Sequence, residues 1–135
     1  MNLLVNIDVD DLPRAIAFYV EAFGLSIGRR FGDGAVELLG APVPIYLLVK
    51  PAGSSATGQS GTTRRYDRHW TPVHLDIVVT DIEAAIQKAL DAGAALERPA
   101  QINSWGKLAL LADPFGNGFC LVQFVGRGYD EIATR

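Results

Sequence analysis

The sequence has one cysteine, no long run of apolar residues and no large excess of charge of either sign. Cys120 has no partner for an internal disulfide, which is typical of a protein of the reducing cytosol. Asp8, Asp10 and Asp11 interrupt the apolar N-terminal stretch, which makes it too short for a signal peptide or a membrane span. The net charge of −3 gives no reason to expect nucleic acid or a membrane surface as a partner. We therefore expect a soluble, cytoplasmic protein.

An internal repeat is the main feature that the sequence does have. Residues 4–25 read LVNIDVDDLPRAIAFYVEAFGL, and residues 74–95 read HLDIVVTDIEAAIQKALDAGAA. Aligned without gaps, the two segments share aspartate at positions 11 and 81 and several apolar residues, but His74 stands where the first segment has Leu4. Two copies of one unit can form a cavity where they face each other, so we expect the function to depend on what lines it.

Each copy predicts the same order of elements. Alternating apolar residues over 3–9 predict a strand, Asp11 caps a helix, and Gly24 is placed to end it; Asp81 and Gly93 repeat this logic. Three strand-like runs separated by turn residues follow each helix. They cover residues 26–30, 35–39 and 44–50 in the first half, and 94–98, 108–112 and 118–124 in the second.

The 135 residues, 49% of them hydrophobic, therefore predict one α+β domain made of two βαβββ modules. The predicted boundaries are 1–52 for the first module, 53–71 for a linker, 72–126 for the second module and 127–135 for a tail. The linker is long and rich in Gly, Ser and Thr, so it could act as a lid or as a hinge for module exchange between chains.

Three segments carry a family likeness: DLPRAIAFYVEAFGL (11–25), HLDIVVTDIEAAI (74–86) and ADPFGNGFCLVQ (112–123). In this order and spacing they resemble the glyoxalase/bleomycin-resistance/dioxygenase superfamily, also called vicinal oxygen chelate proteins. The resemblance implies paired βαβββ modules whose strands form a cupped mixed sheet. It also implies a lyase, isomerase, dioxygenase or transferase activity, or metal-free drug binding.

The resemblance also implies four metal-ligand positions, which here hold Leu4, Leu47, His74 and Cys120, with Tyr46 in place of Leu47 if the register differs by one. Leucine cannot bind a metal, and two ligands fall short of the three that catalytic zinc uses. We therefore predict no cofactor. A divalent metal stays open only if a nearby oxygen ligand takes part, and Asp76 lies two residues deeper on its strand.

His74 is the candidate general base, with a hydrogen-bonded structural histidine as the alternative. Cys120 fits a small buried side chain better than a nucleophile. Polar or aromatic residues expected on the cavity walls are the candidate ligand contacts: Asn6, Asp8, Tyr46, Asp76, Trp70, Trp105 and Cys120. The run RRYDRHW (64–70) could receive an anion, or its arginines could pair with nearby Asp67.

The leading hypothesis is a protein with an incomplete metal site that binds a small organic molecule in the cup between the modules. The alternatives are a metal-dependent lyase, isomerase or dioxygenase with an unorthodox site around His74, and a drug-sequestering resistance protein. Cationic drugs would favour an acidic cleft. The resemblance and the long linker make a homodimer the expected assembly.

Overall fold

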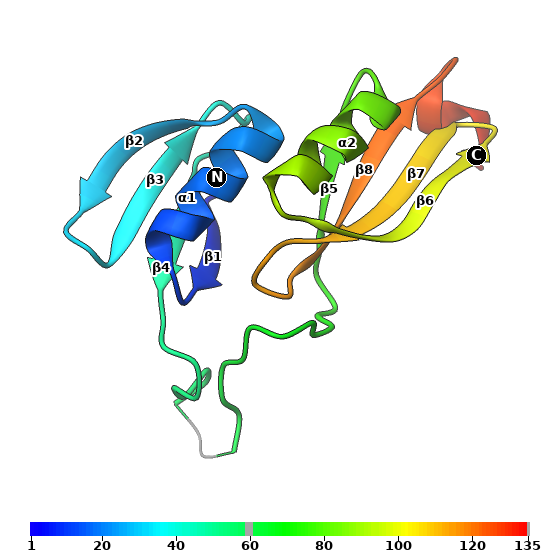
Figure 1. Ribbon diagram of the computed structural model, residues 1–135. Coiled ribbons are helices and arrows are strands. Elements are labelled where there is room, and N and C mark those ends of the chain that lie inside the picture. Colours follow the sequence, from blue (N-terminus) through cyan, green and yellow to red (C-terminus); the bar gives the residue numbers. More distant parts are fainter. Residues whose placement is uncertain (59–60, 135) are drawn as a thin grey trace. The chain divides into compact units, whose positions relative to one another are not determined.

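The computed structural model describes residues 1–58 and 61–134 (Figure 1). The chain forms two compact units, Met1–Asp67 and Arg68–Arg135. The boundary between them falls inside the predicted linker, so part of that segment belongs to each unit. In both units a four-stranded mixed sheet carries one helix, as the α+β prediction requires.

In the first unit, the outer strand β1 pairs in parallel with β4, and the remaining pairs are antiparallel, in the order β1-β4-β3-β2. The predicted βαβββ order is confirmed. The elements are β1 (Val5–Val9), α1 (Leu12–Phe23), β2 (Ser26–Phe31), β3 (Ala35–Leu39) and β4 (Ile45–Val49).

The second unit repeats this topology in the order β5-β8-β7-β6. Strand β6 runs five residues past the predicted end at Arg98, because Pro99 is tolerated on an edge strand whose pairing shifts register on either side of Arg98. The elements are β5 (Leu75–Val78), α2 (Ile82–Ala92), β6 (Ala95–Asn103), β7 (Gly106–Ala112), β8 (Gly118–Phe124) and a short 3₁₀ helix, η1 (Gly128–Glu131).

Both helices begin and end where the sequence predicts. The Asp11 carboxylate accepts from the Arg14 amide at 3.0 Å, and Asp81 accepts from the Ala84 amide at 3.1 Å. Gly24 and Gly93 end the helices with positive φ, which glycine adopts without a steric penalty. The repeated aspartates are therefore caps.

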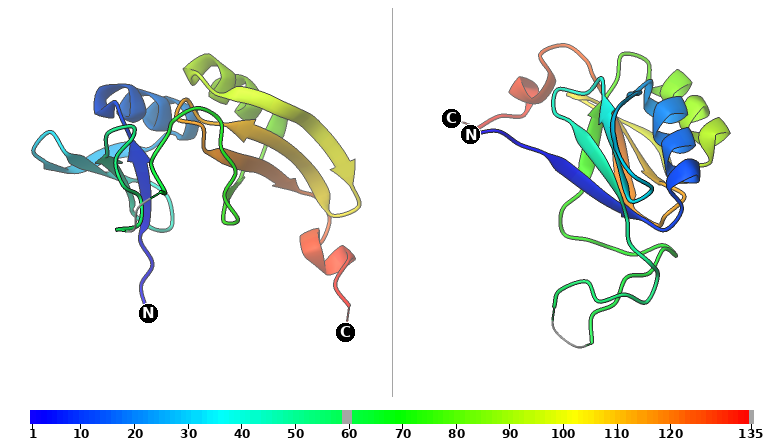
Figure 2. Two further views of the ribbon diagram at one scale, coloured as in Figure 1. Left: turned by 90° about the horizontal axis from the view of Figure 1, so that it is seen from below. Right: turned by 90° about the vertical axis from the view of Figure 1, so that its left-hand side faces the viewer.

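One face of each sheet packs against its own helix, and this face forms the core of the unit (Figure 2). Fully buried side chains lie there, among them Leu47 and Phe18 in the first unit and Leu111, Phe115 and Leu121 in the second. Because side chains alternate along a strand, the intervening residues lie on the opposite face, which we call the open face.

Residues 53–66 of the predicted linker 53–71 fold back on the first unit, as far as the structure describes them; residues 59 and 60 lie outside the described part of the chain. Ser55 and Thr63 form an isolated β-bridge, and the Gly53 amide donates to the Arg64 carbonyl at 2.7 Å. Arg64 Nε donates to Asp8 Oδ2 at 2.6 Å. The Tyr66 hydroxyl donates to the Lys50 carbonyl, also at 2.6 Å, so the loop is closed at its base.

Among the described residues, none of the helices is both long and apolar enough to cross a membrane. The predicted tail contains η1 and residues up to 134, and Arg135 lies outside the described part of the chain.

Candidate ligand pocket of the second unit

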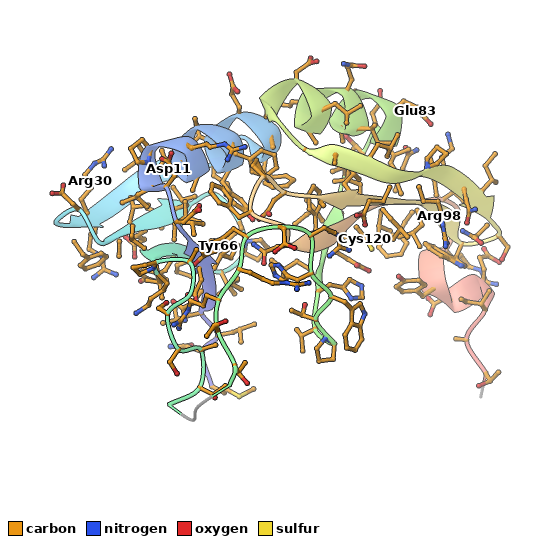
Figure 3. All side chains as sticks on the ribbon, turned by 60° about the horizontal axis from the view of Figure 1, so that its bottom comes forward. Asp11, Arg30, Tyr66, Glu83, Arg98 and Cys120 are labelled. Carbon is orange, nitrogen blue, oxygen red and sulfur yellow. The ribbon has the colours of Figure 1, made fainter. Side chains whose placement is uncertain are left out.

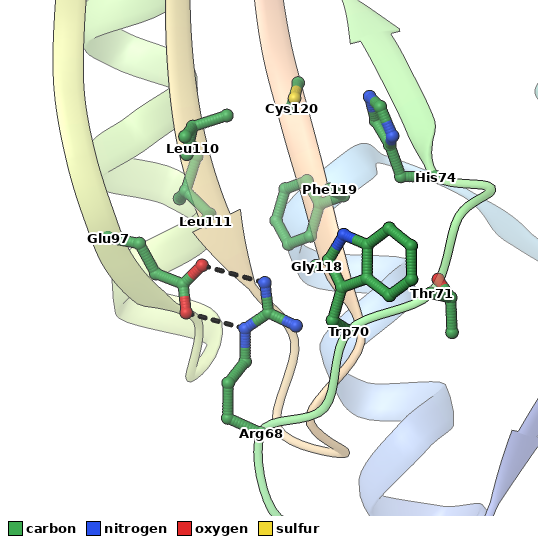
Figure 4. Close-up of a pocket in the computed structure, with 10 residues that line it drawn as sticks. All are labelled: Arg68, Trp70, Thr71, His74, Glu97, Leu110, Leu111, Gly118, Phe119 and Cys120. Atoms are coloured by element: carbon green, nitrogen blue, oxygen red, sulfur yellow. Dashed lines mark hydrogen bonds and ion pairs between the residues drawn. The ribbon is translucent and has the colours of Figure 1, made fainter.

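The second unit contains an open pocket of about 210 Å³ (Figure 4). Strands β6, β7 and β8 contribute to it together with the segment that leads into β5. The lining mixes apolar and polar side chains: Arg68, Trp70, Thr71, His74, Glu97, Leu110, Leu111, Gly118, Phe119 and Cys120. Its volume lies below the roughly 300–1,000 Å³ of pockets for drug-sized molecules. The pocket therefore suits a small molecule, or one part of a larger one.

Arg68 and Glu97 form an ion pair within this lining, with Arg68 Nε 2.6 Å from Glu97 Oε2 and Nη2 3.0 Å from Oε1 (Figure 4). The pairing lowers the pKa of Glu97 and raises that of Arg68. Gly118 leaves room for the guanidinium, since a Cβ there would stand 2.5 Å from Arg68 Nη2. On this wall of the pocket, the positive charge of Arg68 is therefore balanced by the negative charge of Glu97.

The turn between β7 and β8 is built around the buried carboxylate of Asp113. Its Oδ1 accepts from the Phe115 and Asn117 amides at 2.8 and 2.9 Å, and its Oδ2 accepts from Asn117 Nδ2 at 2.9 Å. His69 docks on the same turn, through its amide to the Gly116 carbonyl at 3.1 Å and through Nε2 to Asn117 Oδ1 at 2.9 Å. The turn therefore holds the segment that carries Trp70 against the start of β8.

His74, Asp76 and Cys120 lie together on the open face. Asp76 is paired with Cys120 across β5 and β8, and His74 Nε2 lies 3.2 Å from Asp76 Oδ1. Cys120 comes from β8 on the side opposite α2 (Figure 3). Burial, and then the neighbouring Asp76 carboxylate, raise the pKa of the Cys120 thiol to about 11. The side chain is therefore a thiol at neutral pH, which disfavours a nucleophile.

These three side chains also meet the donor requirement of a metal better than the sequence predicted. From its place two residues deeper on the strand, Asp76 is predicted to share a metal with His74 and Cys120 only if the metal is displaced, and one ligand atom from each of the three lies within 4.8 Å of the others. His74 lies just before β5, and its ring extends toward the Asp76 carboxylate. One nitrogen, one oxygen and one sulfur ligand is a set that zinc accepts, provided that the three atoms move closer together. The residues therefore fit a divalent metal in donor type and number.

The strand register identifies the first-unit counterpart of Cys120. Asn6 pairs with Tyr46 in the first unit as Asp76 pairs with Cys120 in the second. Leu47 is fully buried in the core. Tyr46 is thus the equivalent position, and the assignment of Leu47 is corrected. Leu4, the residue equivalent to His74, lies just before β1 and is exposed.

The open face of the first unit carries a polar cluster that sequence reasoning missed. Glu37 is buried; its Oε2 accepts from the Tyr46 hydroxyl at 2.8 Å and from Arg29 Nη2 at 2.6 Å. Arg29, then Tyr46, lower the pKa of Glu37 to about 2. Along strand β3, Glu37 stands between Val36 and Leu38, whose side chains belong to the core, so its own side chain lies on the open face. A single acidic residue in an otherwise apolar strand was the sequence signal that could have identified this cluster.

The remaining predicted contacts are spread over both units. Asn6 is exposed, and Asp8 is paired with Arg64. Trp70 lines the pocket, with an exposed fraction of 80%. Trp105 lies instead against Tyr129, with ring centroids 5.0 Å apart, and is absent from the pocket lining. The structure therefore brings together His74, Asp76, Cys120 and Trp70 of the predicted set.

The sequence is similar to a known family and to several curated proteins. The family model of the glyoxalase-like domain matches residues 4–122. The uncharacterized protein Rv0887c of Mycobacterium tuberculosis (strain ATCC 25618 / H37Rv) is 36% identical over 132 residues, 92% of this chain and 75% of that protein. The anthracycline biosynthesis protein DauV of Streptomyces sp. (strain C5) is 26% identical over 119 residues, which cover 88% of this chain and 40% of DauV.

Solved structures agree on the fold. A glyoxalase/bleomycin resistance protein/dioxygenase family enzyme from Burkholderia phytofirmans PsJN has a TM-score of 0.69 at 19% identity, covering 90% of this chain and 97% of its own. The fosfomycin resistance protein FosX from Listeria monocytogenes has a TM-score of 0.70 at 14% identity, covering 93% of each chain. The family model covers most of the chain, which therefore belongs to the glyoxalase-like domain family, and its repeated βαβββ units share the fold of these solved structures.

Proposed function

We propose that this protein binds a small organic molecule in the pocket of the second unit. The observation that carries the proposal is the composition of the lining. Leu110 and Trp70 supply apolar surface, while His74 supplies a polar group whose ring is oriented by Asp76. Ligand pockets commonly combine an apolar wall with a few positioned polar groups. The bound molecule would rest on the apolar side chains and exchange a hydrogen bond with His74.

Thermal unfolding in the presence of a library of small organic molecules tests this proposal. A ligand at a hundred times its dissociation constant should stabilise the protein by about 2.7 kcal/mol and raise the unfolding temperature. The variants Trp70→Ala and His74→Ala should lose the shift of any true pocket ligand. Asp130→Asn, an exposed carboxylate on η1, is the matched control and should keep it. Hits that survive both pocket variants would place binding elsewhere and contradict the proposal.

A second candidate function is metal-dependent chemistry, and the three donor atoms of His74, Asp76 and Cys120 favour it. A bound divalent metal would supply Lewis-acid polarisation of a substrate oxygen. Here His74 would contribute its nitrogen, Asp76 one carboxylate oxygen and Cys120 its sulfur. The lyase, isomerase or dioxygenase alternative would need this site, whereas binding alone would not.

Titration with cobalt(II) tests the metal site without any assay of activity. The Cys120 thiol has a raised pKa and must lose its proton to bind, so affinity should rise steadily with pH below about 11. A sulfur-to-cobalt charge-transfer absorption should appear and should vanish in Cys120→Ser. A spectrum that is unchanged by cobalt at every pH would contradict the metal candidate and leave the binding proposal standing.

Drug sequestration is a special case of the binding proposal, and the fold likeness to the fosfomycin resistance protein FosX is compatible with it. The homodimer and the cytoplasmic location stay predictions. Size measurement in solution would test the first of them.

A further inference from the structure

We infer that the first unit carries a binding site of its own, and that this site takes a free α-amino acid with an apolar side chain. The inference goes beyond the proposed function, because the site is built from other residues than the pocket of the second unit. It follows from three features of the first unit: an open pocket beside α1, a register shift that directs Arg30 into it, and two opposite charges that are left unpaired among the described residues.

The pocket is formed by the start of α1 and by the hairpin of β2 and β3. Its volume is about 530 Å³, within the roughly 300–1,000 Å³ that is typical of small-molecule sites. The helix contributes an apolar wall and the hairpin a polar one. The lining residues are Leu12, Pro13 and Ile16 from α1, and Arg30, Gly32 and Asp33 from the hairpin.

The direction of the Arg30 side chain depends on an irregularity in β2. The register between β2 and β3 shifts by one residue between Ile27 and Arg30. Ile27 pairs with Leu38 of the core, so regular alternation would direct the side chain of residue 30 to the open face. The shift instead pairs Arg30 with Val36, which is also in the core, and so directs its side chain to the face that carries α1 (Figure 3). Irregularities of this kind often redirect a side chain at a functional site.

Arg30 brings an unpaired guanidinium to the pocket. Within the part of the chain that the structure describes, its side chain takes part in no ion pair and no hydrogen bond. A planar guanidinium presents its donors in a fork that matches a carboxylate. Arg30 is therefore the group that would receive the carboxylate of a ligand.

Several other arginines of the first unit and of the segment after it already have acidic partners. The neighbouring Arg29 is bound to Glu37 on the open face. The three arginines of the run 64–70 are also paired, so the structure favours local pairing for this run over the reception of an anion, which the sequence had left open. The pairs are Arg64 with Asp8, Arg65 with Asp67, and Arg68 with Glu97.

Asp33 supplies the opposite charge in the same lining. It lies in the turn after β2 and is exposed, and its carboxylate has no ion-pair or hydrogen-bond partner among the described residues, Arg30 included. A simple acid would pair with Arg30 but would be repelled by Asp33, and a simple amine would meet the reverse difficulty. A molecule that carries both an ammonium and a carboxylate group would match both side chains.

The apolar wall determines which zwitterion fits. Leu12 is buried, Ile16 is half-buried and Pro13 is exposed, so the wall is partly in contact with water and an apolar side chain of the ligand would cover it. An α-amino acid carries its ammonium, carboxylate and side chain on one carbon, which suits three surfaces of one small pocket. The end of a peptide carries only one of the two charges, and the inferred ligand is therefore the free amino acid.

Three compounds that share a phenyl ring test the inference: L-phenylalanine, 3-phenylpropanoate, which lacks the ammonium group, and 2-phenylethylamine, which lacks the carboxylate. Calorimetric titration of the full chain at pH 7 should give phenylalanine an affinity about tenfold above that of either analogue. Free glycine, with both charges and no side chain, should bind more weakly than phenylalanine. The amide NMR signals of Gly32 and Asp33 should shift on binding.

Two variants separate the charges. Arg30→Gln should weaken phenylalanine and 3-phenylpropanoate about tenfold and should not weaken 2-phenylethylamine. Asp33→Asn should weaken phenylalanine and 2-phenylethylamine and should not weaken 3-phenylpropanoate. The matched control is Arg98→Gln, which should change nothing, because Arg98 is also exposed on an edge strand and lines neither pocket. The unfolding temperature of each variant confirms that it remains folded.

The outcomes distinguish this site from the pocket of the second unit. Equal affinities for the three phenyl compounds would overturn the inference, and so would a lack of binding or phenylalanine binding that survives both Arg30→Gln and Asp33→Asn. Amide shifts at Thr71 and Cys120 in place of Gly32 would also overturn it, and would assign the amino acid to the pocket of the second unit. In each of these cases the function proposed above still stands.

Discussion

Replacing Asp113 with alanine is expected to lower the free energy of unfolding by about 3 kcal/mol. The carboxylate is buried and accepts three hydrogen bonds, from the amides of Phe115 and Asn117 and from the Asn117 side chain. Alanine would leave these donors without an acceptor in a buried turn, and each buried unpaired group costs about 1–3 kcal/mol. Because His69 docks on the same turn, ligand binding in the pocket should weaken together with stability.

Chemical denaturation measures this loss, and Asp81→Ala is the contrast. Asp81 is an exposed helix cap, whose removal should cost about 1 kcal/mol. A second variant, Asp113→Asn, keeps the Oδ1 acceptor and should retain a large part of the stability. If Asp113→Ala cost no more than Asp81→Ala, the turn would not be the organising element described above.

Replacing Gly106 with alanine should destabilise the second unit by about 4 kcal/mol. Gly106 has φ of +155°, a conformation that side chains rarely adopt. An added Cβ would also overlap the backbone carbonyl oxygen of Gln123 on the neighbouring strand. The backbone at Gly106 and at Gln123 cannot move apart without breaking hydrogen bonds between β7 and β8, so the clash cannot be relieved by a small local shift. Thermal unfolding should show the loss.

Gly118→Ala is the matched control on the same sheet. Gly118 is not among the glycines with positive φ, and the nearest atom to an added Cβ is the flexible end of Arg68. The arginine can move aside, so this variant should cost about 1 kcal/mol or less. Equal losses for the two glycines would mean that space, and not backbone conformation, limits position 106.

The sequence predicted the fold well, because periodicity and caps are local signals. The caps at Asp11 and Asp81 and the glycines at 24 and 93 correspond to observed helix ends, and the strand predicted over 3–9 ends at Val9 as expected but begins at Val5. The late end of β6 was not predicted. Pro99 breaks a strand pattern in sequence, and only the position of β6 at the sheet edge makes it acceptable.

The site was predicted in part. The family resemblance pointed to His74 and Cys120, and Asp76 was named as a nearby oxygen donor, but their mutual distances depend on the pairing of β5 with β8 and on side-chain direction, which spacing does not give. Glu97 and Glu37 were missed because each is recognised by a partner distant in sequence, Arg68 in one case and Tyr46 with Arg29 in the other. From sequence alone, an acidic residue in a strand is expected to face solvent, and only the structure shows the partner that it binds.

The closed loop at residues 53–66 affects how the chain would respond to cleavage. Ala56, Thr57 and Gly58 of this loop are exposed, and exposed loop residues are preferred sites of proteolytic cleavage. A cut after Ala56 would assign Arg64 and Tyr66 to the C-terminal fragment, yet these two residues are bonded to Asp8 and Lys50 of the N-terminal one. The two pieces would therefore share a non-covalent clasp, which keeps their effective concentration high after the covalent connection is lost. Such a chain is suited to fragment complementation, with the break placed where the polypeptide already holds itself together.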